Sequence, residues 1–403
     1  MSELLEQTYP RRIEKEIEEL LDTDEIIVVT GMRRVGKTTL LQRIRKKLET
    51  ENNCYFDLEN ILERELFQQK NYRQIFDDLV EAASLNRDER MYVFIDEIQL
   101  YPEITSVIKY LYDHYQIKFI LTGSSSFYME NLFPESLAGR KFVLQLNPLD
   151  FQEFLVFKEQ GNLAPFTSLA EKASTKSEYR TKNLAALYRE YQNSGGFPEV
   201  VLSETRELKK RRINDIYSSY FRIDVQQLSD FRKTEAFQKL ARLLLRRIGK
   251  KINVQKLSSQ VGVTRKTVYS YLEFLECSYF IKRLQPFSRS PDREVSGQPK
   301  VYVADTGLAC LLGNQEGGGS VLENAVFNQL RNQFDKINYY QRRSGAEIDF
   351  IVDKKIGLEV KETVRAPDIR KLNRLKKELG LSEAYVVTEN YHQAPEVILA
   401  CDL

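Results

Sequence analysis

The segment GMRRVGKT, at residues 31–38, constrains the fold of this chain more than any other feature. It matches the pattern GxxxxGK(S/T), whose glycines let a loop curl so that its backbone N–H groups point at phosphate. The apolar run EIIVVT (25–30) precedes it, and the helical stretch TTLLQRIRKKLE (38–49) follows it. A buried strand that leads through such a loop into a helix predicts a phosphate-binding loop in an α/β fold.

The loop predicts how ATP and Mg²⁺ would be bound as cofactors. Lys37 is expected to bridge the β- and γ-phosphates, and the Thr38 hydroxyl is expected to bind the metal. The partial positive charge at the start of the following helix adds to the attraction. The residues expected to bind the nucleotide are Gly31, Met32, Arg33, Arg34, Val35, Gly36, Lys37, Thr38 and Thr39.

Two adjacent acids end a second apolar run, YVFIDE (92–97). Asp96 is expected to hold the magnesium ion, and Glu97 to orient and deprotonate the attacking water. This pairing predicts hydrolysis of the nucleotide rather than binding alone.

Two further candidates follow along the chain. In KFILTGSSS (118–126), Ser124 or Thr122 would contact the γ-phosphate or the attacking water, unless the segment is an ordinary strand-end turn. In LAGRK, Arg140 is a candidate arginine finger or lid arginine, which stabilises charge on the transferring phosphoryl group. The alternative for Arg140 is a solvated turn.

Strand candidates alternate with helical stretches throughout the first 150 residues. The runs at 25–30, 54–60, 91–98 and 118–124 are short and apolar, with helical stretches between them. This alternation predicts a doubly wound parallel sheet.

Residues 252–287 predict a helix, a tight turn, a second helix and a β hairpin. Gly262 suits the turn, and Thr264 is a good N-cap for the second helix. If this unit binds DNA, its contacts come from the start of the second helix and from the hairpin. The residues expected there are Arg265, Lys266, Thr267, Ser270, Lys282 and Arg283. The alternative is a winged helix that serves only packing or oligomer contact.

The C-terminal region predicts a second magnesium site. Asp349 lies on the strand candidate EIDFIV, while Glu359 and Lys361 share one side of GLEVKET (357–363). Together with Glu323, the two acids are expected to hold magnesium, with Lys361 positioning a metal-bound water. The neighbouring Arg342 and Arg343 are expected to meet a DNA backbone, and the alternative is an exposed hairpin with salt bridges.

Composition limits the remaining possibilities. The formal net charge of the 403 residues is only +2, so any basic surface for DNA must be local. The four cysteines form no CxxC pair, which fits a reducing compartment, and two histidines argue against a histidine-based zinc site. The N-terminus lacks a signal-peptide core, and no apolar run is long enough to span a membrane. We therefore expect a cytoplasmic protein without a membrane partner.

Several segments together resemble a bacterial and archaeal AAA+ ATPase family. They are the strand–GMRRVGKT–helix, YVFIDEIQ, FILTGSSS, LAGRKFVLQLNPLDFQEF, SGGFPEVV (194–201), YFRIDV (220–225) and KVYVADTGL (300–308). The resemblance extends from about Pro10 to about Val387. It implies an AAA+ P-loop core, a helical lid, a winged helix and a C-terminal α/β domain that resembles PD-(D/E)xK restriction endonucleases. It also implies a possible homo-oligomer, in which the arginine of one subunit reaches the nucleotide of the next.

The expected domains are the ATPase core at 1–150, a helical lid or connection at 151–234, a winged helix at 235–291 and the nuclease-like domain at 292–403. The leading hypothesis is an ATP-hydrolysing enzyme that binds or processes DNA. One alternative is a nucleotide-dependent switch whose nuclease-like domain binds a protein without catalysis. Another is a magnesium-dependent DNA endonuclease regulated by ATP.

Overall fold

The computed structural model describes residues 8–124, 139–225, 234–288, 294, 297–313, 317–342 and 345–403. The chain divides into two compact units. The first comprises Met1–Asn147 with Cys277–Tyr279, and the second comprises Pro148–Glu276 with Phe280–Leu403.

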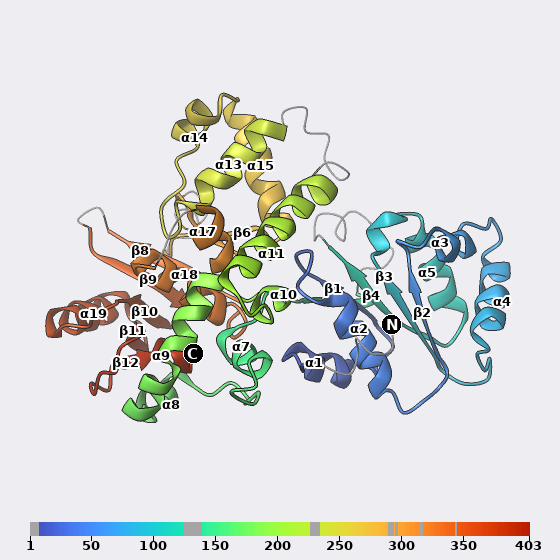
Figure 1. Cartoon of the computed structure of the whole chain (residues 1–403), viewed down its shortest axis with the longest axis horizontal. Coiled ribbons are helices and arrows are strands. Elements are labelled where there is room, and N and C mark those ends of the chain that lie inside the picture. The colour runs from blue at the N-terminus through green and yellow to red at the C-terminus, as the bar shows by residue number, and fades with distance from the viewer. Residues whose placement is uncertain are drawn as a thin grey trace. The chain divides into compact units, whose positions relative to one another are not determined.

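The first unit contains a five-stranded parallel sheet in the order β2-β3-β4-β1-β5 (Figure 1). Its strands are β1 (Ile26–Thr30), β2 (Asn53–Asp57), β3 (Met91–Asp96), β4 (Ile117–Gly123) and β5 (Lys141–Gln145). The first four confirm the strands expected from the sequence, whereas β5 is an additional strand beside β1. The predicted parallel α/β sheet is therefore confirmed.

Helices bury both faces of this sheet. They are α1 (Ile13–Leu20), α2 (Lys37–Lys47), α3 (Ile61–Leu66), α4 (Tyr72–Ala83), the 3₁₀ turn η2 (Ile98–Leu100) and α5 (Ile104–His114). Alternate residues of β1, such as Ile26 and Val28, share a core with α4 and α5. The intervening residues face away from that core, because side chains alternate along a strand. Burial on both faces explains why the three central strands β1, β3 and β4 are almost continuously apolar.

The register of the strands brings four chain segments to one edge of the sheet. Thr30 pairs with Gly123, and Asp57 pairs with Asp96. The carboxyl ends of β1, β2, β3 and β4 therefore lie together, where an open α/β sheet binds its ligand.

The second unit begins with helices that pack through aromatic side chains. They are α7 (Phe151–Phe157), α8 (Leu169–Ser174), α9 (Glu178–Ser194), α10 (Pro198–Val201), α11 (Arg206–Ser219), the π-helical turn η4 (Tyr220–Val225) and α13 (Thr234–Leu245). The rings of Phe151, Phe154, Tyr188 and Tyr191 contact one another between α7 and α9. All four are almost fully buried, so they form the local core.

The expected helix–turn–helix elements follow. They are α14 (Val254–Val261) and α15 (Arg265–Cys277), joined through Gly262 at φ 72°. The Thr264 hydroxyl accepts a hydrogen bond from the Thr267 N–H at 3.2 Å, as expected of an N-cap. The predicted hairpin within 252–287 is wrong. β6 (Ile281–Leu284) pairs instead with the distant β7 (Lys300–Val303), and the Phe287 N–H just after β6 donates to the Tyr339 carbonyl oxygen.

A second five-stranded sheet, in the order β12-β11-β10-β9-β8, lies in the C-terminal part of this unit. Its elements are α17 (Thr306–Gly313), α18 (Gly319–Leu330), β8 (Ile337–Gln341), β9 (Glu347–Val352), β10 (Ile356–Val360), α19 (Ala366–Leu379), β11 (Glu383–Thr388), β12 (Val397–Leu399) and η5 (Ala400–Asp402). β8, β9 and β10 are antiparallel, while β10, β11 and β12 are parallel. The strands expected around Asp349 and Glu359 are present as β9 and β10. Within the described ranges, no helix combines the length and the apolar character needed to cross a bilayer.

Candidate nucleotide-binding site

The loop between β1 and α2 depends on glycine at both ends. Gly31 has φ 153°, and a Cβ there would lie 2.2 Å from the Leu146 carbonyl oxygen. Gly36 has φ 99° and caps the start of α2. A side chain at either position would strain the loop or push it from the neighbouring backbone. The structure thus gives a local reason for both glycines of the motif.

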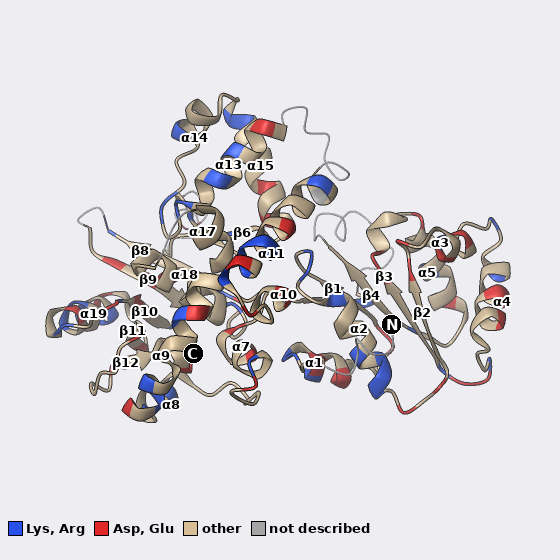
Figure 2. Ribbon diagram, in the orientation of Figure 1, with Lys and Arg blue, Asp and Glu red and all other residues tan. Residues whose placement is uncertain are grey.

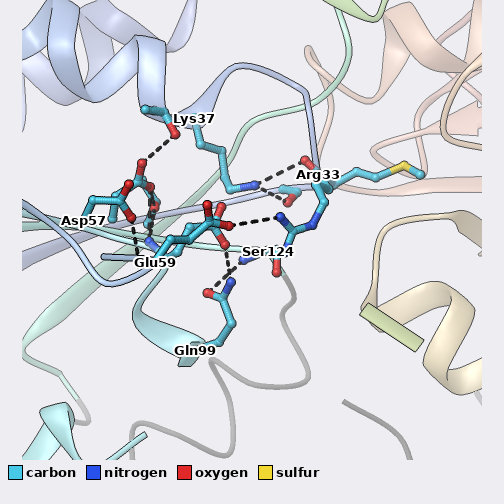
Figure 3. Close-up of polar contacts among 12 residues, drawn as sticks. Arg33, Lys37, Asp57, Glu59, Gln99 and Ser124 are labelled. Atoms are coloured by element: carbon cyan, nitrogen blue, oxygen red, sulfur yellow. Dashed lines mark hydrogen bonds and ion pairs between the residues drawn. The ribbon is translucent and has the colours of Figure 1, made fainter. Parts of the chain in front are cut away.

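Lys37 is buried at the first turn of α2, with its ammonium turned back over the loop (Figure 3). Its Nζ donates hydrogen bonds to the carbonyl oxygens of Gly31 at 3.1 Å and Met32 at 3.3 Å. These acceptors satisfy the N–H groups without neutralising the charge. The ammonium therefore keeps its positive charge beside the loop amides, where it can attract a phosphate.

The Asp96 carboxylate lies at the end of β3 and is held by neutral donors. The Thr38 hydroxyl donates to its Oδ2 at 2.5 Å and the Tyr55 hydroxyl at 2.9 Å. Its Oδ1 accepts from the Glu97 N–H at 3.1 Å and from the Thr122 hydroxyl. Burial chiefly, and Asp96 beside it, raise the pKa of Tyr55 well above its ordinary value, so this hydroxyl remains a donor.

Glu97 follows directly and adopts a left-handed backbone conformation, with φ 54°. Its N–H also donates to the Thr122 hydroxyl oxygen at 3.0 Å, and its carboxylate accepts from the Gln99 amide. Gln99 in turn accepts from the Ser124 N–H at 3.4 Å (Figure 3). Such a conformation in a residue other than glycine costs about 1–3 kcal/mol, and these hydrogen bonds hold it.

The edge also carries two acids for which the sequence gives no motif. Asp57 ends β2 opposite Asp96, and burial, reinforced by the nearby Asp96, raises its pKa. Glu59 lies 3.5 Å from the Arg33 guanidinium, so it pairs with the phosphate-binding loop (Figure 3). Both acids come from the segment CYFDLEN, where only the strand itself was predictable.

Arg11, just before α1, is a further residue that the motif does not reveal. Its buried guanidinium donates to the carbonyl oxygens of Val35 at 2.9 Å and Asn147 at 2.7 Å. Because a trans peptide directs its C=O and N–H oppositely, fixing the Val35 carbonyl also fixes the direction of the Gly36 N–H. Arg11 therefore positions part of the phosphate-binding loop.

Glu14 anchors this arrangement. It accepts from the Arg11 N–H at 2.8 Å, from Arg43 at 2.8 Å and from Lys47 at 2.7 Å. Burial opposes its ionisation, but the hydrogen bonds from Arg43 and Lys47 lower the pKa of Glu14 below its ordinary value. α1 is thus joined to α2 through an ionised acid.

The donor set at this edge suits magnesium. Magnesium takes oxygen ligands and usually one or two carboxylates, with water and phosphate oxygens completing the octahedron. The Thr38 hydroxyl and the Asp96 carboxylate touch each other, and Asp57 is in register with Asp96. The residues present therefore fit the metal that the motif implies.

Ser124 and Arg140 lie at opposite ends of the parallel strands. Ser124 is buried directly after β4, beside Gln99. The Arg140 carbonyl instead accepts from the Ile26 N–H at the amino end of β1, and its guanidinium pairs with Asp113. The length of β1 separates that edge from the loop by roughly 13 Å, at about 3.3 Å per residue. Arg140 is therefore remote from the loop of its own chain, and its role as a finger stays a prediction about a second copy.

The predicted C-terminal metal site is arranged differently. The Lys300 ammonium lies 3.6 Å from Glu323 and 3.6 Å from Asp349, while Lys361 and Lys371 each lie 3.0 Å from Glu359. Across the parts of the chain that the structure describes, no group of three His, Cys, Asp or Glu side chains is placed to hold a metal ion. Lysines therefore lie beside each acid of the set expected to bind magnesium. Burial, reinforced by the nearby Glu323, raises the pKa of Asp349.

The residues expected to meet DNA divide into two groups. Arg265, Lys266 and Ser270 are exposed near the start of α15. Figure 2 shows both basic and acidic residues along α11, where Arg211 pairs with Glu207 and Arg212 with Glu199. Arg283 instead pairs with Glu276, and Lys282 lies 3.8 Å from the same acid. Arg342 pairs with Glu378 at 2.7 Å, and Arg343 lies outside the described residues.

Three segments of the chain match known protein families. Residues 23–155 match a family described as an AAA domain. Residues 185–317 and 318–401 each match a domain of unknown function, DUF8612 and DUF4143 respectively. The match at 23–155 and the parallel sheet around the loop support a P-loop domain of the AAA type in this part of the chain.

Relatives extend over most of the chain. An uncharacterized protein of Methanocaldococcus jannaschii is 27% identical over 398 residues, which cover 94% of this chain and 85% of that protein. An uncharacterized protein of Haemophilus influenzae is 26% identical over 345 residues, covering 83% and 80% respectively. Among solved structures, the Walker-type ATPase of Pyrococcus abyssi is similar over 76% of this chain and 96% of that one, at 16% identity and a TM-score of 0.47.

Proposed function

We propose that this protein binds ATP with magnesium at the loop between β1 and α2 and hydrolyses it. The contact between the Thr38 hydroxyl and the Asp96 carboxylate carries the proposal. It joins the loop to the neighbouring acid at the edge where Lys37 also lies. Magnesium, when bound there, offsets negative charge on the β- and γ-phosphates.

Each step of the reaction has a residue of this chain to perform it. The loop amides and the Lys37 ammonium bind the phosphates, with the Gly36 N–H directed by Arg11. Glu97 accepts a proton from the attacking water. Gln99 donates to the Glu97 carboxylate and contacts Ser124, so it orients the base and fixes its distance from the end of β4.

The test compares two lysines of α2. Lys37→Ala is expected to abolish ATP hydrolysis, because the ammonium over the loop is lost. Lys46→Ala, an exposed residue on the same helix, is the matched control and is expected to hydrolyse ATP normally. Phosphate release at saturating ATP measures both, and unchanged hydrolysis by Lys37→Ala would refute the assignment.

We further propose that α15 binds DNA. The observation in favour is the exposure of Arg265, Lys266 and Ser270 on the second helix of a helix–turn–helix. Such residues reach base edges and phosphates when this helix enters a major groove.

Salt dependence tests this second proposal. DNA affinity of the protein should fall steeply with salt, and the double variant Arg265→Ala/Lys266→Ala should flatten the slope of log K against log salt by about 2. The matched control is Arg211→Ala/Arg212→Ala on α11. Equal binding by both double variants, or none by the wild type, would favour a nucleotide-dependent switch that contacts protein instead.

A DNA endonuclease regulated by ATP would need the C-terminal acids to hold a metal. Lys300 lies between Glu323 and Asp349, so these residues do not fit that ion. We therefore derive no cleavage step for this region.

A further inference from the structure

Lys300, at the start of β7, lies inside a ring of acids. Its Nζ is 2.5 Å from Glu347 Oε1 and 3.6 Å from an oxygen of Glu323 and of Asp349. Its side chain is only 4% exposed, and its ammonium lies 5.3 Å from the centre of the Tyr339 ring. A charge removed this far from water needs such compensation.

Neutral donors satisfy the same three carboxylates. Glu323 accepts from the Tyr302 hydroxyl at 2.5 Å. Glu347 Oε2 accepts from the Gln341 amide at 2.7 Å, and Asp349 Oδ2 accepts from the Val360 N–H at 2.8 Å. Each acid therefore has both an ammonium neighbour and a neutral donor, all supplied by the chain itself.

The backbone closes this pocket on a further side. A Cβ at Gly249 would lie 2.8 Å from both carboxylate oxygens of Glu323. Gly249 also has φ 70°, which favours glycine. Because the Gly249 backbone lies so close to the Glu323 carboxylate, that carboxylate has little room to move outward and coordinate a metal ion.

We infer that Lys300 is the resident cation of this acidic pocket and excludes the divalent metal that the carboxylate pattern predicts there. An ammonium offers three N–H groups, which suits a site with three surrounding carboxylates. A divalent ion would instead need about six oxygen ligands and would repel the ammonium beside it. Lys300 and the metal are alternative occupants.

Glu359, the remaining acid of the predicted set, lies near enough to Asp349 to raise the pKa of that carboxyl, but it pairs with two other lysines. Its Oε1 accepts from Lys371 at 3.0 Å and also pairs with Lys361. Lys361, expected to position a metal-bound water, is therefore engaged with an acid.

The pocket also joins two segments of the second unit. Lys300 belongs to the segment matched at 185–317, and its three acids belong to the segment matched at 318–401. The charge that a metal would supply to an isolated nuclease-like domain comes here from the preceding segment.

Manganese binding to the full-length chain tests the inference. Mn²⁺ is the probe, measured by electron paramagnetic resonance without nucleotide, in an Asp96→Asn background that removes the metal ligand at the first site. With Lys300 present, we expect the pocket to bind no Mn²⁺. A further Asp349→Asn change should therefore leave the amount of bound Mn²⁺ unchanged. Adding Lys300→Met is expected to create one Mn²⁺ site per chain, which Asp349→Asn then abolishes.

Two results would overturn the inference. One is Mn²⁺ binding with Lys300 intact that disappears in Asp349→Asn, a measurement that does not depend on the Lys300 variant folding. The other is a folded Lys300→Met protein that binds no Mn²⁺. Lys354→Met, which removes a half-exposed lysine paired with Glu294, is the matched control and should create no site.

Discussion

The two acidic clusters of this protein differ in what surrounds their carboxylates. Around Asp96 the donors are neutral, from the Thr38, Tyr55 and Thr122 hydroxyls and the Glu97 N–H. Around Glu323, Glu347 and Asp349 the central donor is the Lys300 ammonium. Neutral donors orient a carboxylate and leave its negative charge available to a metal ion, whereas an ammonium group neutralises that charge.

The comparison teaches that an acid pattern does not by itself define a metal site. The first cluster places Asp57 and Asp96 at the ends of neighbouring strands, and the second places Glu347 and Asp349 on β9 with Glu323 of α18. Only in the first cluster does the nearby lysine, Lys37, donate hydrogen bonds to backbone carbonyl oxygens rather than to the acids. The position of the nearest lysine thus separates a site suited to a metal from one that already contains a cation.

Glu97→Gln gives the largest expected effect and probes the first cluster. The amide keeps the shape of the side chain but cannot accept a proton from water. We expect ATP binding to persist and turnover to fall about 10²–10⁴-fold, the range for loss of a general base. Glu103→Gln, an exposed residue at the start of α5, is the control. A normal rate of phosphate release from Glu97→Gln would show that another group activates the water.

The first cluster could be predicted from sequence because its information is local. The loop motif fixes Lys37 and Thr38, and apolar runs fix the strands. In a parallel sheet, the carboxyl ends of the strands meet at one edge. The contact between Thr38 and Asp96 follows from those facts alone.

The site residues that could not be predicted from the sequence interact with groups that produce no recognisable sequence motif. Arg11 binds backbone carbonyls at Val35 and Asn147, and every residue of a chain has a carbonyl. Lys300 begins the short apolar run KVYV, where an end lysine is usually solvated. Its burial follows from a tertiary arrangement of β7, α18 and β9 that periodicity does not encode. The same cause made the hairpin prediction wrong, since β6 finds its partner across a long connection.

Arg11→Met gives the next largest effect and tests whether the first cluster also depends on backbone orientation. Loss of the two carbonyl contacts frees the Val35–Gly36 peptide. A change of about 1.4 kcal/mol in binding would raise the KM for ATP about tenfold, with a smaller change in kcat.

Two variants sharpen that measurement. Arg11→Lys should restore part of the affinity, because it keeps a charged donor. Lys15→Met on α1 removes an exposed ion pair with Glu19 and should leave KM unchanged. If Arg11→Met lowers thermal stability but not ATP affinity, Arg11 serves folding alone.

Asp305 gives the smallest expected effect and supplies a third kind of acid, which accepts hydrogen bonds from backbone N–H groups and has the Arg331 guanidinium nearby. The Gly196 N–H donates at 2.6 Å and the Leu308 N–H at 3.3 Å, yet burial raises the pKa of Asp305 to about 6. A raised pKa means that the folded state binds a proton more readily than the unfolded state. Stability from this group is therefore present below its ordinary pKa of about 4 and is lost as pH rises to about 6.

The measurement is thermal unfolding at pH 4 and pH 7 for the wild type and Asp305→Asn. The amide cannot ionise but can still accept hydrogen bonds from the backbone N–H groups, so the variant should lose less stability on going to pH 7. The expected difference is a few degrees, from at most about 3 kcal/mol for a pKa displaced by about two units. An equal pH response would mean that these N–H groups stabilise the carboxylate as fully as water does. Backbone N–H donors would then suffice to hold a buried carboxylate in its ionised form.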